Sequence, residues 1–144
     1  MKSTIRLAVG LFVGLIAANG RAVATDHLLG FEIRHALGGI TLDGIYPTGA
    51  FFSETYGEDG TIHYHDADGA DKGDWSVRGD TFCTFYHRQA GGCFYVVSHG
   101  ANCFTFHRSA EDKTGRRAPG AEWSAEGWNR DRPATCPKSP EVEI

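Results

Sequence analysis

Short apolar segments separated by turn residues run from Ile40 to Arg108, and they limit the possible fold more than any other feature of the chain. Turns such as Glu58-Asp59-Gly60, Gly79-Asp80 and Gly91-Gly92 recur at intervals of roughly ten residues, a spacing typical of an antiparallel meander. The predicted strands are Ile40–Leu42, Ala50–Tyr56, Thr61–His65, Asp74–Arg78, Thr81–His87, Cys93–Ser98 and Asn102–His107. We therefore expect a mainly β fold in which the meander forms a small barrel or curled sheet, because closure removes exposed strand edges.

One short helix is expected before the first strand, over Asp26–Leu37. Leu29, Ile33 and Leu37 recur at a spacing of four and therefore share one helical face. Such a face could bind a partner, but we favour a helix that closes one end of the core.

The C-terminal part of the chain, residues 109 to 144, is mostly polar and loses the alternation of the preceding strands. We expect an irregular segment that Trp123 and Trp128 hold against the sheet. The expected organisation is a single β-rich domain over residues 25–136, followed by a flexible tail over residues 137–144.

The first 24 residues have the features of a cleaved signal peptide. Lys2 and Arg6 precede an apolar run from Leu7 to Ala18, and Ala22-Val23-Ala24 offers small residues to a signal peptidase. The apolar run is shorter than the roughly 20 residues that a membrane-spanning helix needs. We therefore expect a periplasmic or secreted protein with no stable membrane anchor.

Removal of this segment makes the chain more acidic. The full sequence has a formal net charge of −4, and the segment carries Lys2, Arg6 and Arg21 but no acid, so the remainder carries −7. An acidic chain of this kind has no general attraction for nucleic acid, and we expect no nucleic-acid partner.

The four cysteines, Cys83, Cys93, Cys103 and Cys136, predict two disulfides, because an even count in an exported chain is typical of paired thiols. Three pairings are possible. We favour Cys83–Cys93, since a hairpin that turns near Arg88 would set these two residues opposite each other at a Cα distance suited to a disulfide. Cys103–Cys136 would then hold the C-terminal segment.

The most suggestive metal-binding pattern is His63-Tyr64-His65, because alternate residues of a strand share a face and could both bind one ion. Ile62 and Tyr64 are the better core residues, so the two histidines are expected to face solvent and would need a third ligand. Glu54 alternates with Phe52 and Tyr56 and could point inward, but a lone acid does not provide the paired carboxylates of a glycosidase.

The segments Glu32–Arg34, Gly38–Gly44, Glu58–Thr61, Gly73–Val77 and Gly79–Cys83, and the later Cys93, follow one another in a recognisable order. This order resembles an uncharacterised family of small exported, disulfide-containing β-rich proteins of alphaproteobacterial type. The resemblance covers Leu28 to Phe106. It implies a secreted β-rich domain with a Cys83–Cys93 bridge, and it implies no chemistry.

These observations favour an exported binding module without enzymatic activity or cofactor. Its ligand would be a small apolar molecule held in the mouth of the barrel by Phe51, Phe52, Tyr64 and Trp75, or its partner another exported protein. One alternative is a periplasmic inhibitor of a protease or lysozyme, which rests on analogy of size and compartment. The other is a metal-dependent enzyme that uses His63 and His65.

Overall fold

The computed structural model describes residues 27–137 of the 144-residue chain. The signal peptide expected over residues 1–24 lies outside the described residues, as does nearly all of the tail expected over residues 137–144.

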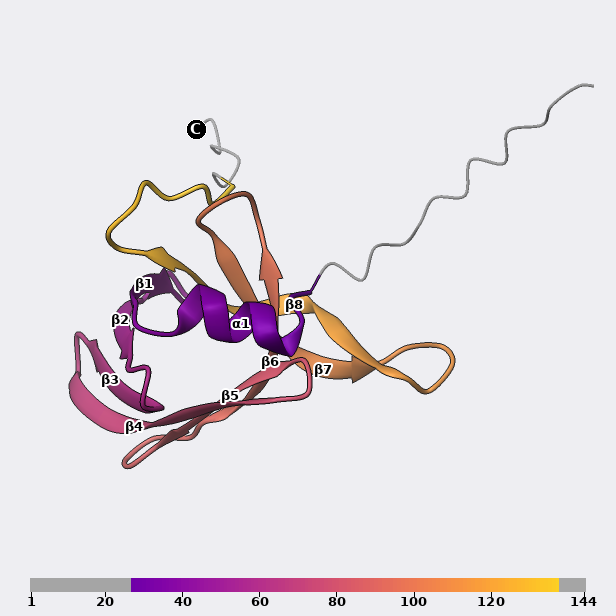
Figure 1. Cartoon of the computed structure of the whole chain (residues 1–144), viewed down its shortest axis with the longest axis horizontal. Helices are drawn as coiled ribbons and strands as arrows, with labels where there is room; N and C mark the ends of the chain where they lie inside the picture. The colour runs from indigo at the N-terminus through magenta and orange to yellow at the C-terminus, as the bar shows by residue number, and fades with distance from the viewer. Residues whose placement is uncertain (1–26, 138–144) are drawn as a thin grey trace, which may run out of the picture.

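One helix and eight strands make up the described part of the chain (Figure 1). The helix α1 spans Gly30–Leu37 and precedes all the strands. The strands are β1 (Thr41–Ile45), β2 (Phe51–Tyr56), β3 (Thr61–Asp66), β4 (Gly69–Arg78), β5 (Thr81–Tyr86), β6 (Gly92–Ser98), β7 (Phe104–Glu111) and β8 (Arg117–Asn129).

Each strand pairs antiparallel with the next one along the chain, and β1 also pairs with β8, so that the sheet closes into a ring. The prediction of a mainly β antiparallel meander with one short N-terminal helix is confirmed. Closure satisfies the backbone donors and acceptors that an open sheet would leave unpaired at its two outer strands.

The C-terminal segment expected to be irregular instead contains β8, the longest strand of the ring. Its inward positions carry the small residues Ala125 and Gly127, which give no apolar alternation to detect in the sequence. Register shifts between Phe106 and Ser109 of the neighbouring strand further interrupt the two-residue period. The prediction for this segment is therefore wrong, and the tight space inside the ring explains why.

Strand β4 begins before the predicted strand Asp74–Arg78, because residues 69–73 also belong to it. The Asp66 carboxylate accepts hydrogen bonds from the backbone N–H groups of Asp68 at 2.9 Å and Gly69 at 3.1 Å, which fixes a tight turn at this point. Gly69 has a φ of 140°, a conformation that other residues rarely adopt. The strand can consequently begin at Gly69 rather than at Asp74.

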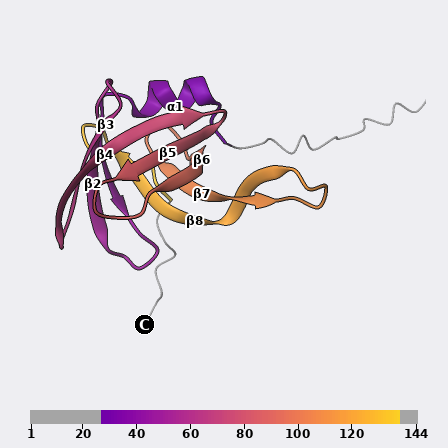
Figure 2. The same ribbon diagram turned by 90° about the horizontal axis from the view of Figure 1, so that it is seen from below.

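Helix α1 lies alongside β4 and β5 and covers one end of the ring (Figure 2). Ile33 and Leu37 are fully buried in the core, as their spacing predicts. The helix begins later than expected, and the Glu32 carboxylate accepts a hydrogen bond from the Leu29 backbone N–H at 2.7 Å. Asp80, in the turn after β4, accepts another from the Gly30 N–H at 2.8 Å.

Two inward-facing glycines make room for larger side chains where β1 meets β8. A Cβ atom on Gly44 would lie 2.4 Å from the Phe52 ring, and one on Gly127 would lie 2.4 Å from Leu42 Cδ2. Gly44 and Gly127 face each other across the two strands. Close approach at this position therefore requires residues without side chains.

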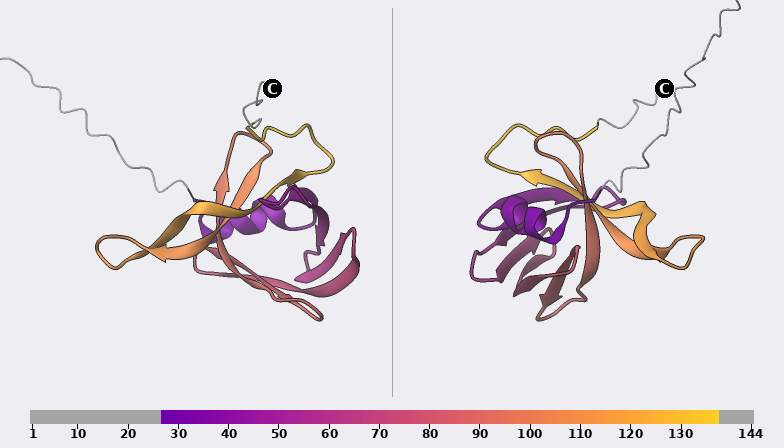
Figure 3. Two further views of the ribbon diagram at one scale, coloured as in Figure 1. Left: turned by 180° about the vertical axis from the view of Figure 1, so that it is seen from behind. Right: turned by 45° about the vertical axis from the view of Figure 1, so that its right-hand side comes forward.

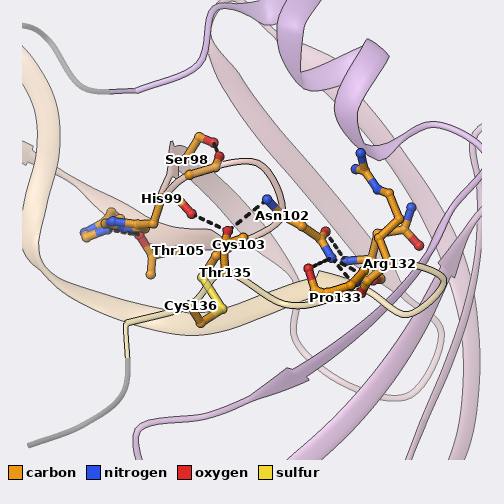
Figure 4. The surroundings of a disulfide bond; sticks show 12 residues. Ser98, His99, Asn102, Cys103, Thr105, Arg132, Pro133, Thr135 and Cys136 are labelled. Carbon is orange, nitrogen blue, oxygen red and sulfur yellow. Dashed lines mark hydrogen bonds between the residues drawn. A yellow bond between two sulfur atoms is a disulfide. The ribbon is translucent and has the colours of Figure 1, made fainter.

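Both predicted disulfides are present, Cys83–Cys93 and Cys103–Cys136, with Cα atoms 4.0 Å and 4.9 Å apart. Cys83 and Cys93 face each other on β5 and β6, as the hairpin argument expects. Cys103 precedes β7 and joins the segment that follows β8 (Figure 4).

Asn102, beside Cys103, fastens the same segment with hydrogen bonds (Figure 4). Its side chain is 2% exposed, donates to the carbonyls of Asn129, Arg132 and Pro133, and accepts from the Asn129 N–H. Thr135 adds a hydroxyl that accepts from the Asn102 N–H at 2.9 Å. The chain after β8 is thus ordered by hydrogen bonds as well as by the disulfide.

We predict that the two disulfides differ in their contribution to stability. In the chain-entropy model, a bridge over 33 residues restricts the unfolded chain more than one over 10 residues. Replacement of Cys103 and Cys136 by serine should lower the free energy of unfolding by about 4 kcal/mol, and replacement of Cys83 and Cys93 by about 3 kcal/mol. Denaturant titration of the two double variants measures both values, and a larger loss for the Cys83/Cys93 variant would contradict the prediction.

Candidate functional site

A cavity of about 300 Å³ lies inside the ring, at the end away from α1. Helix α1 contacts the turn between β4 and β5 through Asp80, whereas the cavity is lined by Gln89, Ala90 and Gly91 at the other end of β5. Seven aromatic side chains line it: Tyr46, Phe52, Tyr56, Phe82, Tyr86, Phe94 and Phe106. The remaining lining includes polar groups of Glu54, Thr84, Arg108 and Ser124.

Glu54 is the acid of this cavity, and it is nearly inaccessible at 4% exposure. On β2, Phe52 lies two residues before Glu54 and Tyr56 two residues after it, so all three side chains point into the ring. One carboxylate oxygen accepts a hydrogen bond from the Tyr56 hydroxyl and the other from the Tyr86 hydroxyl. Tyr86 comes from β5, so the carboxyl group joins two parts of the ring interior.

No basic side chain within residues 27–137 forms an ion pair with Glu54; the ion pairs there join Arg88 to Asp71, Arg116 to Asp112 and Arg130 to Asp43. Burial raises the pKa of Glu54 because it penalises the charged form, while the two tyrosine hydroxyls act in the opposite direction. Burial also raises the pKa values of Tyr56 and Tyr86, and the nearby carboxylate adds to this effect. Both phenols therefore keep their protons and serve as donors.

A second group of phenols lies beside the first. Tyr64 donates to the Asp66 carboxylate at 2.7 Å, and the Tyr46 hydroxyl lies 3.1 Å from that of Tyr64. Since the Tyr64 proton is used on Asp66, Tyr46 acts as the donor in this pair. The Tyr64 hydrogen bond lowers the pKa of Asp66, which remains ionised.

Arg108 is the basic residue along the cavity lining, and its position is exposed. Its guanidinium carbon lies 5.5 Å from the centre of the Phe94 ring, which places the cation over the aromatic face. The positive charge thus sits at the solvent side of the cavity, whereas the Glu54 carboxyl group sits inside.

Of the four residues expected to hold a ligand, Phe52 lines this cavity, and Phe51, Tyr64 and Trp75 do not. Phe51 points to the opposite face of β2 and is 51% exposed. Tyr64 is buried, and Trp75 packs against Tyr56 and Phe82 with its indole N–H bonded to the Gly57 carbonyl at 2.8 Å. Of the four, Phe52 alone lines the cavity, Tyr64 and Trp75 fill other parts of the ring interior, and Phe51 faces outward.

His63 and His65 lie exposed on the outer face of β3, beside a depression that His87 also lines. In the described range the one compact group of three potential ligands is Cys103, Glu126 and Cys136, and its two cysteines form a disulfide. The structure therefore does not bring a third ligand within coordination distance of both histidines. Metal binding by His63 and His65 stays a prediction.

Tyr86 and Arg108 are site residues that the sequence analysis did not identify. Tyr86 falls in a predicted strand, but its partner Glu54 is 32 residues away, and only the strand order brings the two together. The inward direction of Glu54 was predictable from alternation along β2. Arg108 ends a run of inward positions after Phe104 and Phe106, and that alternation is the signal that could have identified it.

Two common arrangements of catalytic residues are missing from the lining of this cavity in the described residues. Glu54 is the single acid among the lining residues of the described chain, so a pair of carboxylates for glycoside hydrolysis is missing there. Neither of the lining hydroxyl groups of Thr84 and Ser124 has a histidine beside it in the cavity, as a nucleophile with a general base would require.

No protein-family model, no curated protein and no solved structure matches the chain. The resemblance to small exported proteins of alphaproteobacterial type accordingly stays a prediction. Helix α1, which is the helix of the described residues, is too short to cross a membrane.

We predict that the Glu54→Gln substitution stabilises the protein increasingly as the pH rises. The raised pKa means that the folded state holds the carboxyl proton more tightly than the unfolded state does. The resulting stability is present below the ordinary pKa of a glutamate and is lost as the pH rises through the raised value. Glutamine has no such loss, so the melting temperature of the variant should gain a few degrees on the wild type between about pH 4 and about pH 7.

Thermal unfolding at the two pH values measures this gain, and comparison of two pH values removes any constant effect of the altered hydrogen bonds. Glu58→Gln is the matched control, because Glu58 is exposed on the turn after β2. A gain that is equal for both variants would contradict the proposed burial cost of Glu54.

Proposed function

We propose that the protein is an exported binding protein that holds a small organic ligand in the cavity of the ring. Glu54 carries this proposal. Two phenol donors fix the orientation of this carboxyl group, which is buried at the inner end of an open cavity. Without a basic partner, such a group is costly to keep buried. Buried polar groups of this kind are typical of small-molecule sites, in which a few fixed polar atoms orient the ligand within an apolar lining.

The size of the cavity supports a ligand of modest dimensions. A volume of about 300 Å³ is at the lower end of the range for small-molecule sites and corresponds to about ten water molecules. The aromatic lining suits the apolar or aromatic ligand expected from the sequence. Glu54 adds the requirement for a polar group at one end of that ligand.

The proposed location is the periplasm or the exterior of the cell. Two disulfides in the described residues, with every cysteine of the chain paired, support an oxidising compartment. The signal-peptide features of residues 1–24 also support export.

Filling the cavity should abolish ligand binding. Ala125 faces Phe106 across β7 and β8 and lines the cavity, so Ala125→Phe would place a ring in the ligand space. Aromatic fragments of about ten non-hydrogen atoms, with cationic, neutral and anionic end groups, are titrated while the backbone amide NMR signals are followed. We expect saturable shifts at cavity residues for at least one fragment, and a loss of affinity of at least about tenfold in the variant.

Ala110→Phe is the control, because Ala110 is exposed on the β7–β8 hairpin outside the ring and should leave the affinity unchanged. Both variants are checked for cooperative unfolding. Failure of every fragment to bind the folded wild-type protein would overturn the proposed function.

A second candidate, inhibition of a protease, is favoured by the hairpin that joins β7 and β8. The hairpin projects away from the ring (Figure 3). Its tip is held by the Asp112 carboxylate, which accepts from the Thr114 hydroxyl and from the N–H groups of Thr114 and Arg116 at 2.8 Å and 3.0 Å. These bonds, with the Thr114 hydroxyl as the largest contribution, lower the pKa of Asp112 to about 2. A fixed, projecting loop with Lys113 and Arg116 is a suitable ligand for the acidic pocket of a trypsin-like protease.

Inhibition assays with a trypsin-like protease test this candidate. If it is correct, the wild-type protein inhibits the protease, and the Lys113→Ala, Arg116→Ala double variant inhibits at least about tenfold less. Lys72→Ala is the control, because it removes an exposed lysine from β4, outside the β7–β8 hairpin. Rapid cleavage at the hairpin without inhibition would contradict the candidate.

A further inference from the structure

The chemical class of the ligand can be inferred from the charges inside and around the cavity, an inference that rests on the proposed function. The inner end of the cavity offers Glu54, both of whose oxygens are fixed by phenol donors from Tyr56 and Tyr86. Because each phenol donates its proton, both oxygens of Glu54 act as acceptors. An ionised carboxylate still has lone pairs free for a further donor.

Among the described residues no basic side chain neutralises the charge that Glu54 carries when it is ionised. The ion pairs of the described residues do not include Glu54, and Arg108, the basic residue of the lining, lies exposed over the Phe94 ring instead. A buried charge without a countercharge is less stable than a paired one. A positively charged ligand would therefore gain affinity from relieving a cost that the empty protein already carries.

The aromatic lining also favours a cation. Rings approach one another closely around the cavity, with Tyr46 and Phe52 centred 4.7 Å apart and Tyr56 and Phe82 centred 5.2 Å apart. The faces of aromatic rings attract cations, and groups of such rings recognise organic ammonium ions. An anion would instead meet the Glu54 carboxylate at the inner end of the cavity.

We propose that the cavity binds a small organic ammonium ion, with its cationic nitrogen directed to Glu54 and its apolar part among the aromatic rings. The cation supplies the countercharge, the hydrogen-bond donor and the partner for the ring faces at once. A neutral ligand supplies at most a donor. Arg108 opposes the entry of a cation only weakly, because charges exposed to solvent are screened.

Three probes of similar size that differ in charge test the proposal: phenethylamine, phenethyl alcohol and phenylpropionate. Isothermal titration at neutral pH should give an affinity for the amine at least about tenfold higher than for the alcohol, and weaker binding still for the carboxylate. Glu54→Gln should reduce amine affinity at least about tenfold and change alcohol affinity by less than about twofold. Arg108→Gln should strengthen amine binding slightly, since it removes a like charge.

Amine affinity should also fall as the pH is lowered, because protonation of Glu54 removes the charge that attracts the ligand. The Glu54→Gln variant should lack this dependence. The pH profile thus separates an electrostatic role for Glu54 from a purely structural one.

The inference is overturned if the alcohol binds as tightly as the amine, or if Glu54→Gln leaves amine affinity unchanged. It is also overturned if phenylpropionate binds best and loses affinity in Arg108→Gln, which would assign the cavity to an anion. In each of these cases binding at the cavity persists and the proposed function stands. If the folded wild-type protein binds none of the three probes, the inference fails, and the proposed function fails with it only if every aromatic fragment of the titration series also fails to bind.

Discussion

Pairing between β1 and β8 holds the remainder of the structure in its arrangement, because it turns a meander with two open edges into a ring with an interior. The two strands meet at Gly44 and Gly127, where side chains would prevent close approach. Outside the ring, Arg130 bridges this junction with a hydrogen-bonded ion pair to Asp43 at 2.7 Å. Without the junction, the inward residues of β2 and β5 would not face a common space.

Closure of the ring also explains why the acidic residue Glu54 is tolerated in the interior. The core near α1 is filled by apolar side chains such as Ile33, Leu37 and Val96, which are themselves fully buried. Toward the other end the rings of Tyr56 and Tyr86 turn their hydroxyls to Glu54 rather than packing against one another. The interior therefore changes from a packed core to a polar-ended cavity along the length of the strands.

Sequence patterns predicted the parts of this architecture that depend on neighbouring residues. Alternation located most strands of the meander and the inward direction of Glu54, and the hairpin argument paired Cys83 with Cys93. The patterns failed where distant residues determine the structure. β8 was missed because its inward residues are small, and the bulky side chains of Leu42 and Phe106 on the neighbouring strands β1 and β7 occupy the space beside them. The Glu54–Tyr86 contact requires the order of the strands, which local periodicity does not contain.

The ladder between β5 and β6 is short, running from Phe82–Phe94 to Thr84–Gly92, and the Cys83–Cys93 bridge lies in the middle of it. Thr84 and Tyr86 line the cavity from one side of this ladder, and Phe94 lines it from the other. A molecule bound at the proposed site would span the two strands from within, while the disulfide joins them from outside. Binding would therefore be coupled to local opening of the ring, and amide hydrogen exchange in β5 and β6 should report the ligand even though the bound molecule would touch few of those amides.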